Sequence, residues 1–481
     1  MKINILSILL FFSFSWSISQ SLDIQLQDIA NENDIAGMSV AVIKEGQVVY
    51  NQGFGMADFG QNLPVTDSTD YRIASVSKMV TAVGFMQLYE QGLVSLDANI
   101  SNIHGYQVKN PHFPAIPITP RMLLSHTSTI VDGNTYNNFL SDTYNELPPP
   151  DMEELLNNNG SYYSNSNFLN KQPGTYFQYS NLNYGIIGTL IEKISGVRFD
   201  EYMRMHVLEP MGIYTGFNVY NLPDISNLAV LYRKQNGNWV PQADNYQGNP
   251  PTSPDYSGYI IGSNGLLFAP QGGLRISAPN IAKMAIMLTD GTYNCVPILQ
   301  DTTAQRMKTV QWTYNGTNGN NYYGLFRSWG LGLQRTTNTN NADIVCPAYR
   351  MWGHAGEAYG LVSDVYFNDT LQTGVVFITN GCGVGYDTPA NSAFYEVEAD
   401  VFAAVCAALP DLVVPPTVVI EGESVTCAAG IYTYSTPLVA GAVYSWTVTG
   451  GTILSGQGTP EISVQWNNVT NGTVNVVVEG P

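Results

Sequence analysis

The chain has 481 residues, of which 44% are hydrophobic and 12% charged, and its formal net charge at pH 7 is −19. This composition is that of a globular protein with a large core, and the length exceeds one typical domain, so two or more domains are expected. The acidic balance, with no basic run, argues against nucleic acid and anionic membrane surfaces as partners.

The first twenty residues have the pattern of a secretory leader. One lysine is followed by an almost wholly apolar run over 5–16 and then by the small residues Ser17 and Ser19. The run is too short for a good membrane span, and it predicts cleavage near residues 19–20. No cysteine stands there for a lipid anchor, and no later stretch is apolar for long enough to span a membrane. We therefore expect a signal peptide over 1–19 and a soluble secreted or periplasmic protein.

A hairpin and a helix are the first elements expected after the leader. Apolar runs at 35–43 and 48–54 flank a Lys-Glu-Gly-Gln turn, a pattern that predicts two antiparallel strands. From Ser75 onward, apolar residues recur at helical spacing until Gly92, which is expected to end the helix. The stretch 93–170 is rich in Asn, Tyr, Ser and Pro, and it predicts loops and short helices.

Helical patterns recur in the middle of the chain. They cover residues 182–194, 199–208 and 276–288. The segments 217–262 and 311–345 are rich in Asn, Gly and Tyr, and they predict long surface loops.

A second hairpin and a closing helix complete this region. Apolar runs at 359–367 and 373–379 flank a polar turn, and 391–408 has the pattern of a helix. Strands therefore cluster at the two ends of the region, and helices lie between them. This order predicts an α+β fold in which one antiparallel sheet, built from both ends, is flanked by helices.

The last part of the chain has a different pattern. Residues 410–416 form a proline-containing linker, and beyond it short alternating runs such as 444–449 and 462–466 lie between Gly, Asn and Thr turns. Such runs are typical of a small β-sandwich, although 417–481 is shorter than the roughly 100 residues of a complete one. The predicted main domain is therefore 20–409, followed by the linker and a sandwich that is short for its class.

Five cysteines stand in a chain that is expected to enter an oxidising compartment. Four of them lie in the main domain, and four cysteines allow three pairings. We favour the bonds Cys295–Cys346 and Cys382–Cys406. Cys427 is then either a buried free thiol or a cysteine whose partner is missing.

A serine and a lysine stand three residues apart at the start of the first predicted helix, at Ser75 and Lys78. This spacing puts both side chains on one helix face, and the partial positive charge at a helix N-terminus favours a developing oxyanion. A lysine whose surroundings lower its pKa accepts a serine proton, so the pair predicts a nucleophilic serine. A serine cap followed by a solvated lysine gives the same pattern, so the prediction depends on the neighbouring motifs.

A further polar group is expected from the segment Tyr179-Ser-Asn181, which follows a Pro-Gly turn and precedes a helix. A phenol near an ammonium group has a lowered pKa, so Tyr179 and Lys78 are expected to share the role of base. The carboxamide of Asn181 can bind Lys78 and a substrate amide at once. The structural alternative is an aromatic residue packed at a helix start.

His354 stands in the segment Trp352-Gly-His-Ala-Gly-Glu-Ala-Tyr-Gly360, directly before a predicted strand. Its glycines, Gly356 among them, allow a backbone edge to approach a substrate closely. We therefore expect His354, Gly356 and Glu357 to contact the substrate, although a lone histidine is more commonly structural. No spacing of histidines or carboxylates suggests a metal site, so neither a metal nor another cofactor is expected.

Taken together, these motifs resemble the serine β-lactamase and penicillin-binding-protein superfamily, in its branch of class C β-lactamases, D,D-peptidases and esterases. The resemblance covers roughly residues 25–405. Besides the three motifs it includes Ile35-Ala-Gly-Met-Ser-Val-Ala-Val, Leu123-Leu-Ser-His-Thr-Ser128, Gly272-Gly-Leu-Arg-Ile-Ser277 and Trp329-Gly-Leu-Gly332. It implies a β-lactamase-like antiparallel sheet flanked by helices, with a helical and loop-rich subdomain.

The resemblance also implies roles for the candidate residues. Ser75 would be the acylated nucleophile, with Lys78 and Tyr179 as general base and acid, and either of these two as the working base. Asn181 would orient Lys78 and the substrate, and the backbone amides of Ser75 and Glu357 would form the oxyanion hole.

One departure from the superfamily bears on the substrate. Many of its lactamases and transpeptidases have Lys-Thr-Gly where this chain has His354-Ala-Gly356, and the missing lysine weakens the case for binding a substrate carboxylate by charge. Histidine there is familiar in esterase-like and peptidase-like members. We expect an exported hydrolase of a small ester, peptide or amide. The alternatives are a D-Ala-D-Ala carboxypeptidase or β-lactamase acting on cell-wall material or β-lactams, and a non-catalytic sensor or binding protein.

The tail, 417–481, resembles an Ig-like domain of the polycystic-kidney-disease type. Such domains are common on exported bacterial enzymes as spacers or adhesion modules. The resemblance implies a cell surface or a polysaccharide as the partner of this domain.

Overall fold

The structure, a computed structural model, describes residues 2–9, 16–384, 386–414, 420–423, 430–438, 442–467 and 471–479. The chain divides into two compact units. The larger unit runs from Ile24 to Pro410, and the smaller one combines the described residues of 1–23 with those of 411–481.

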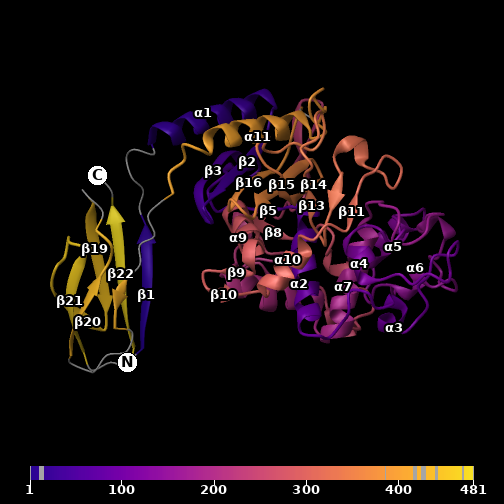
Figure 1. The fold of residues 1–481 in the computed structure, drawn as a ribbon, viewed down its shortest axis with the longest axis horizontal. Helices are drawn as coiled ribbons and strands as arrows, with labels where there is room; N and C mark the ends of the chain where they lie inside the picture. The colour runs from indigo at the N-terminus through magenta and orange to yellow at the C-terminus, as the bar shows by residue number, and fades with distance from the viewer. Residues whose placement is uncertain are drawn as a thin grey trace. The chain divides into compact units, whose positions relative to one another are not determined.

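A nine-stranded antiparallel sheet forms the centre of the larger unit (Figure 1). In spatial order its strands are β11 (Trp312–Thr313), β12 (Ser328–Trp329), β13 (Gln334–Arg335), β14 (Trp352–Ala358), β15 (Leu361–Asn368), β16 (Thr373–Thr379), β2 (Gly37–Lys44), β3 (Gln47–Asp58) and β4 (Leu63–Pro64). The two predicted hairpins are β2–β3 and β15–β16. They join where β16 pairs with β2, with Gly374 opposite Ile43 and Thr379 opposite Met38. The predicted sheet built from both ends of the domain is therefore confirmed.

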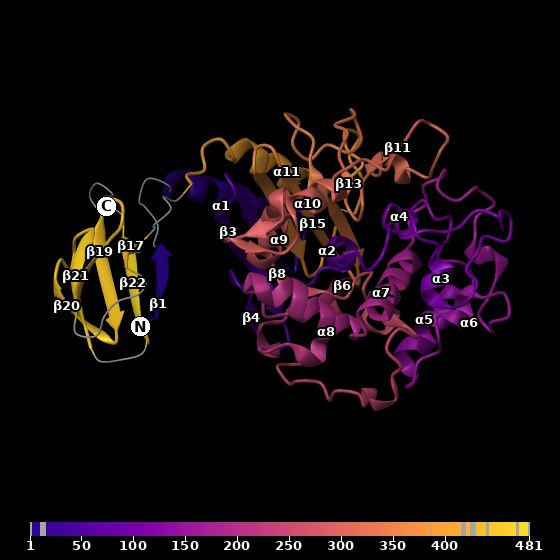
Figure 2. The same ribbon diagram turned by 60° about the horizontal axis from the view of Figure 1, so that its bottom comes forward.

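Helices cover both faces of this sheet (Figures 1 and 2). Phe367 on β15 belongs to the core that α9 (Ala278–Asp290) shares, whereas Tyr366 packs against Phe402 of α11 (Glu396–Ala408), with ring centroids 5.9 Å apart. Side chains alternate between the faces of a strand, so α9 and α11 lie on opposite faces. Because both faces are buried, β2, β15 and β16 have nearly continuous apolar sequences.

Most of the other helices form a largely helical part beside the sheet (Figure 1). They are α2 (Ser77–Glu90), α3 (Ile100–His104), α4 (Pro120–Leu124), α5 (Tyr136–Asn145), α6 (Glu153–Leu156), α7 (Asn181–Ser195) and α8 (Phe199–Met203). Two helices lie elsewhere: α1 (Trp16–Glu32) runs alongside α11, and α10 (Asp301–Met307) packs on α9. Within the helical part, α7 packs on α2, α3 and α4. Every residue of α2 from Ser77 to Leu88 is buried. A polar side chain at the start of this helix is therefore surrounded by protein groups.

Several short strands pair outside the main sheet. They pair as β5 (Asp70–Arg72) with β8 (Arg275–Ser277), β6 (Leu231–Gln235) with β7 (Asn238–Ala243), and β9 (Thr292–Tyr293) with β10 (Val296–Pro297). Of these, β6 and β7 lie in the segment 217–262, which was expected to be surface loop. The segment 311–345 was expected to be surface loop, yet it supplies β11, β12 and β13 of the main sheet. These strands have only two residues each, too few to show an alternating pattern in the sequence.

Several helix boundaries differ from the predicted ones. The helix predicted from Ser75 begins as a 3-10 turn over Ala74–Val76, and α2 follows from Ser77. The helix predicted over 276–288 begins at Ala278, with a proline in its first turn, because the two preceding residues belong to β8. The closing helix predicted over 391–408 begins only at Glu396, where a capping box formed with Tyr395 starts it.

The smaller unit contains two sheets. One has the order β17 (Glu421–Gly422), β18 (Ile431–Ser435), β21 (Glu461–Trp466), β20 (Gly451–Ser455), and the other has the order β1 (Lys2–Leu9), β22 (Asn471–Glu479), β19 (Val443–Thr449). Buried Tyr434, Trp446, Trp466 and Val476 join both sheets in one core, as expected for a β-sandwich. The strand β1 falls within the region predicted to be a leader and pairs parallel with β22. The leader itself stays a prediction.

The predicted disulfide pairing is wrong. Cys346 is bonded to Cys406 on α11, whereas Cys295 is a free exposed thiol and Cys382 a free buried one. Only residues whose Cα atoms approach within about 7 Å can be bridged, and here that separation is 5.7 Å. The packing of α11 brings these two cysteines together, and spacing along the chain carries no information about it. Cys427 lies outside the described residues.

This pairing predicts a specific labelling pattern. Mass spectrometry of unreduced peptides is expected to find Cys346 linked to Cys406, and native thiol labelling is expected to modify Cys295 much faster than Cys382. Replacing Cys406 with serine opens a loop with a sequence separation of 60 residues. By loop-closure entropy we expect this to lower the free energy of unfolding by about 4 kcal/mol, measured by denaturant titration. A peptide in which Cys346 is joined to Cys295 would contradict the structure.

Candidate active site

Ser75 lies in the tight 3-10 turn that leads into α2, and its side chain is half-buried. Ala74 before it has a φ of +44°, a backbone conformation that residues other than glycine rarely adopt. Strand β14 passes directly against this turn: a Cβ atom placed on Gly356 would lie 2.9 Å from the carbonyl oxygen of Ile73 and 3.0 Å from the Ser75 nitrogen. The close approach requires glycine at position 356, and it holds the strained turn against strand β14.

Lys78 is fully buried, and its ammonium group contacts Ser75 directly. Its Nζ donates hydrogen bonds to Ser75 Oγ at 2.9 Å, to Asn181 Oδ1 at 2.9 Å and to the carbonyl oxygen of Gln271 at 2.7 Å. These three acceptors match the three donors of a charged lysine. Once neutral, the same nitrogen has a lone pair available for the hydroxyl proton of Ser75.

The surroundings of Lys78 lower the pKa of its ammonium group to about 7. Burial is the main cause, because it removes water from the charged form, and the negative charge of Asp132 opposes it. A large fraction of Lys78 is therefore neutral near pH 7. This is the property that the sequence-based prediction required of a lysine base.

Asp132 connects the start of α7 with Lys78 through Asn181. Its Oδ2 accepts hydrogen bonds from the backbone nitrogen of Asn181 at 3.0 Å and from its Nδ2 at 2.9 Å, and its Oδ1 accepts from the backbone nitrogen of Leu182 at 2.9 Å. The carboxylate thus satisfies free N–H groups at the helix N-terminus, where negative charge is favoured. It also turns the carboxamide so that Asn181 Oδ1 faces Lys78. No sequence motif indicated Asp132, which lies 49 residues before Asn181 along the chain.

Tyr179 stands beside Ser75 and Lys78, with Lys78 Nζ 4.9 Å from the centre of its ring. The expectation that the ammonium would lower the pKa of this phenol is wrong. Burial raises that pKa above its ordinary value, and a hydrogen bond with Ser75 offsets only part of the increase. Lys78 lies over the face of the ring instead of at the hydroxyl. The phenol is therefore protonated near neutral pH, which suits a proton donor and not a base.

The ring of Tyr179 is held in a cluster of aromatic side chains. It packs against His126 at 4.4 Å and is stacked on Phe326 at 5.2 Å, measured between ring centroids. The backbone nitrogen of Ser180 donates a hydrogen bond to Nδ1 of His126 at 3.2 Å, and burial keeps the pKa of this histidine well below its usual value. His126 is therefore neutral and positions the segment that carries Tyr179. It lies in the segment Leu123–Ser128, for which the sequence suggested no role.

His354 does not occupy the position expected of a substrate contact. Its side chain on β14 is fully buried, and its Nδ1 lies 2.6 Å from the carbonyl oxygen of Ala355. The ring packs against Trp329 at 5.4 Å and Tyr179 at 6.0 Å, and burial lowers its pKa to about 3. The structure therefore places neutral His354 behind Tyr179, where it supports the aromatic cluster. The large neighbouring rings exclude it from the substrate side.

A cavity of about 500 Å³ opens over Ser75. Its walls are formed by Ser75, Tyr179, Asn181, Tyr322, Tyr323, Leu325, Phe326, Ala355, Gly356, Glu357, Thr388, Ala393, Tyr395 and Glu398. Of the predicted site residues, Ser75, Tyr179, Asn181, Gly356 and Glu357 line it, Lys78 lies beneath it and His354 lies behind it. A small molecule in this cavity would meet Ser75 Oγ directly.

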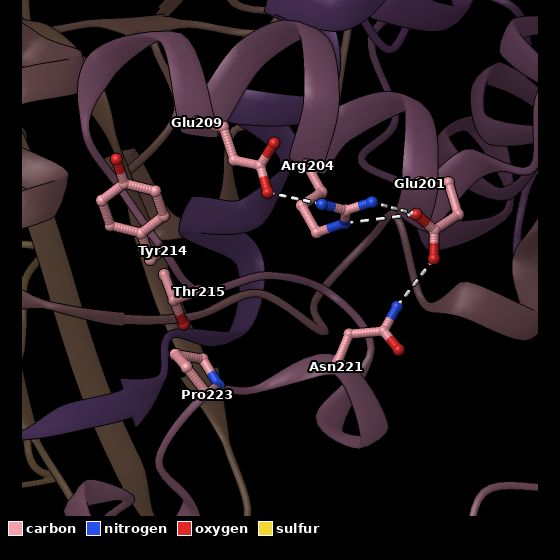
Figure 3. Close-up of a pocket in the computed structure, with 7 residues that line it drawn as sticks. All are labelled: Glu201, Arg204, Glu209, Tyr214, Thr215, Asn221 and Pro223. Atoms are coloured by element: carbon pink, nitrogen blue, oxygen red, sulfur yellow. Dashed lines mark hydrogen bonds and ion pairs between the residues drawn. The ribbon is translucent and has the colours of Figure 1, made fainter.

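A second cavity of about 340 Å³ lies near α8 (Figure 3). Its central charge, Arg204, is bound by Glu201 at 2.6 Å and also by Glu209. Asn221 Nδ2 donates a hydrogen bond to the other carboxylate oxygen of Glu201 at 2.9 Å. Because these groups already satisfy one another, the cavity over Ser75 is the better candidate site.

The described residues contain neither a metal-binding cluster nor a membrane-spanning helix. Among them there is no group of three or more His, Cys, Asp or Glu side chains that could hold a metal ion. In the same residues, no helix has both the length and the apolar character needed to cross a membrane.

Two protein-family models match the chain. The family model described as Beta-lactamase matches residues 23–393, and the model described as PKD-like domain matches residues 413–480. One similar relative is Protein flp of Staphylococcus aureus (strain MW2), which is 26% identical over 192 residues. This match covers 40% of the present chain and 36% of the staphylococcal protein, so the chain corresponds to well under half of that relative.

Solved structures share the fold. The octameric penicillin-binding protein homologue from Pyrococcus abyssi has a TM-score of 0.58 and 19% identity, with 93% of this chain and 99% of that one covered. The D-amino acid amidase from Ochrobactrum anthropi SV3, solved with L-phenylalanine amide, has a TM-score of 0.57 and 20% identity, with 81% and 99% covered. At these identities the likeness shows the fold alone.

The Asp132 contacts predict the effect of Asp132→Asn. Removing the charge is expected to lower the pKa of Lys78 further below 7, because Asp132 now opposes the effect of burial. The new amide NH2 group would face N–H donors that a carboxylate oxygen now accepts, so we also expect a loss of about 1 kcal/mol of stability. Both are measurable, by NMR titration of the labelled lysine nitrogen and by denaturant unfolding. Asp67→Asn, at an exposed carboxylate, is the control for net charge. An unchanged or raised Lys78 pKa in Asp132→Asn would contradict the assignment.

Proposed function

The chain belongs to the beta-lactamase family, and on that premise we propose that it is a serine hydrolase that cleaves an ester or a small amide or peptide bond through an acyl-enzyme on Ser75. The observation that carries the proposal is the 2.9 Å hydrogen bond between Ser75 Oγ and a buried lysine whose pKa is lowered to about 7. A protein that only binds its ligand has no need of such a base, and this disfavours the alternative of a non-catalytic sensor.

In the proposed acylation step, neutral Lys78 accepts the hydroxyl proton as Ser75 Oγ bonds to the carbonyl carbon of the substrate. The carbonyl oxygen becomes an oxyanion between the backbone amides of Ser75 and Glu357, whose segments the close approach at Gly356 brings together. Tyr179 then protonates the leaving oxygen or nitrogen as its bond to the carbonyl carbon breaks. The Lys78 ammonium then gives its proton to the Tyr179 phenolate, so that both groups are neutral again.

Water completes the cycle in the proposed deacylation step. It attacks the acyl carbon and loses one proton to Lys78, and the bond to Ser75 Oγ breaks as that oxygen is protonated again. The products are a carboxylic acid and the free enzyme. Asn181, held by Asp132, keeps Lys78 Nζ directed at Ser75 throughout.

The cavity favours esters and amides over substrates that are recognised by a carboxylate. Among the described residues that line it there is no lysine or arginine, and His354 is buried and neutral. A D-Ala-D-Ala carboxypeptidase or a β-lactamase would need a positive group near the substrate carboxylate. The related amidase structure supports an amide as one substrate class.

We also propose that the protein is exported, on the basis of the leader pattern over 1–19. The PKD-like domain would then act as a spacer or an adhesion module at a cell surface or a polysaccharide. Sequencing the N-terminus of protein recovered from the culture medium or the periplasm tests the export.

Hydrolysis of p-nitrophenyl acetate tests the nucleophile. Wild type is expected to release nitrophenol, and Ser75→Ala is expected to lose at least about 10³-fold of the activity, because no other group can form the acyl-enzyme. Ser68→Ala, at an exposed serine, is the matched control. Equal rates for wild type and Ser75→Ala would refute the proposed function. A fluorescent penicillin, added separately, tests the β-lactam alternative by covalent labelling of Ser75.

The pH dependence of kcat/KM identifies the base. With Lys78 as the base, log(kcat/KM) is expected to rise with a slope near one up to about pH 7 and then level off, because the neutral form accumulates as the pH passes its pKa. With an amide substrate, whose amine leaving group must be protonated, Tyr179→Phe is expected to lower kcat about 10²-fold and to leave that midpoint near pH 7. A midpoint near pH 10, lost in Tyr179→Phe, would instead assign the base role to the phenol.

A further inference from the structure

The walls of the cavity over Ser75 are acidic and aromatic. The side chains of Glu357 and Glu398 carry the only carboxyl groups among the described residues that line it, and no lysine, arginine or histidine is among them. Rings from Tyr179, Tyr322, Tyr323, Phe326 and Tyr395 line the same space. With a formal net charge of −19, the whole chain adds a negative potential to this local one.

Glu357 is the acidic group that a ligand can reach. Its side chain is exposed, and one carboxylate oxygen accepts a hydrogen bond from the hydroxyl of Tyr395 at 2.7 Å. No ion pair joins it to a lysine, arginine or histidine within the described part of the chain. A carboxylate has about four acceptor positions, so most of those of Glu357 remain open. The structure thus presents an oriented negative charge without a positive partner.

Glu398 has a different role in the same wall. It is buried and accepts a hydrogen bond from the backbone nitrogen of Tyr395 at 2.6 Å, and burial together with Glu398 raises the pKa of the buried carboxyl of Asp364. These contacts fix the start of α11 and with it the Tyr395 hydroxyl that orients Glu357. Burial and the neighbouring carboxylate Glu357 both raise the pKa of Glu398, to about 7.

The position of Glu357 relates it to the reacting bond. It follows Gly356, whose backbone lies against the Ser75 nitrogen. In the proposed mechanism the backbone amide of Glu357 donates to the substrate oxyanion. The side chain of Glu357 therefore starts close in space to the scissile carbonyl. A positive group close to that carbonyl is therefore within reach of the carboxylate. Tyr322 and Tyr323 line the same cavity, and tyrosine rings can bind a cation over their π faces.

We propose that the cavity selects substrates that carry an ammonium group near the scissile carbonyl, with Glu357 as its ion partner and the tyrosine rings as cation–π partners. The substrate class is then an amino-acyl ester or amide with a free amine. This inference rests on the proposed function, since it names the substrate class of the same site. The side chain of Glu357 would then determine substrate specificity, in addition to the role of its backbone amide in the oxyanion hole.

Binding to the Ser75→Ala variant tests the inference without turnover. The probes are D- and L-phenylalanine amide and their N-acetyl derivatives, which differ in charge but share the ring and the amide. At pH 6.5, isothermal calorimetry is expected to give a Kd about tenfold lower for at least one free amine than for its acetyl derivative. Glu357→Gln in the same background is expected to abolish the ratio. Glu396→Gln changes the net charge equally on the exposed first turn of α11 and is expected to keep it.

Turnover separates the inference from the function on which it rests. In the active enzyme, the ratio of kcat/KM for the free amine to that for the acetyl derivative is expected to be about ten and to fall to about one in Glu357→Gln. Equal binding of the two probes, or an equal effect of Glu357→Gln and Glu396→Gln, would overturn the inference even if p-nitrophenyl acetate is hydrolysed through Ser75. If p-nitrophenyl acetate is not hydrolysed, the proposed function fails, while the binding experiment still decides whether the cavity prefers an ammonium group.

Discussion

The burial of Lys78 is the constraint on which the rest of the site depends. A buried ammonium group is costly unless hydrogen bonds replace its water, and here Ser75, Asn181 and the Gln271 carbonyl do so. None of the three carries a charge, so the charged form is only partly compensated and the pKa falls to about 7. The same arrangement that makes the lysine tolerable in the core therefore makes it a base. Asp132 acts one step away, through Asn181.

Three distant parts of the chain have to meet for this arrangement to exist. They are the turn at Ser75, the N-terminus of α7 and strand β14; the turn packs against β14, and the helix that follows it packs on α7. At Gly356 the approach is so close that any side chain would collide with the backbone of the turn. A site assembled from such segments is held by the whole α+β core, and none of its parts could keep the geometry alone.

The division of labour between Lys78 and Tyr179 follows from their surroundings. Both groups are buried, and burial disfavours the charged form of each, so it lowers the pKa of the lysine and raises that of the phenol. The aromatic packing of His126 and Phe326 around Tyr179 supplies that environment. Lys78, as a neutral amine, is therefore the proton acceptor, and Tyr179, as a neutral phenol, is the proton donor.

The sequence by itself determined what depends on local spacing. The separation of Ser75 and Lys78, the alternation of strands and helices, and the sandwich pattern after the linker all follow from neighbouring residues, and the structure agrees with each in outline. Tertiary structure decided everything that depends on which segments meet. It buried His354 behind Tyr179, brought Asp132 to Asn181, and paired Cys346 with Cys406. It also reversed the expected shift of the Tyr179 pKa, because desolvation depends on the neighbours a group acquires in the folded chain.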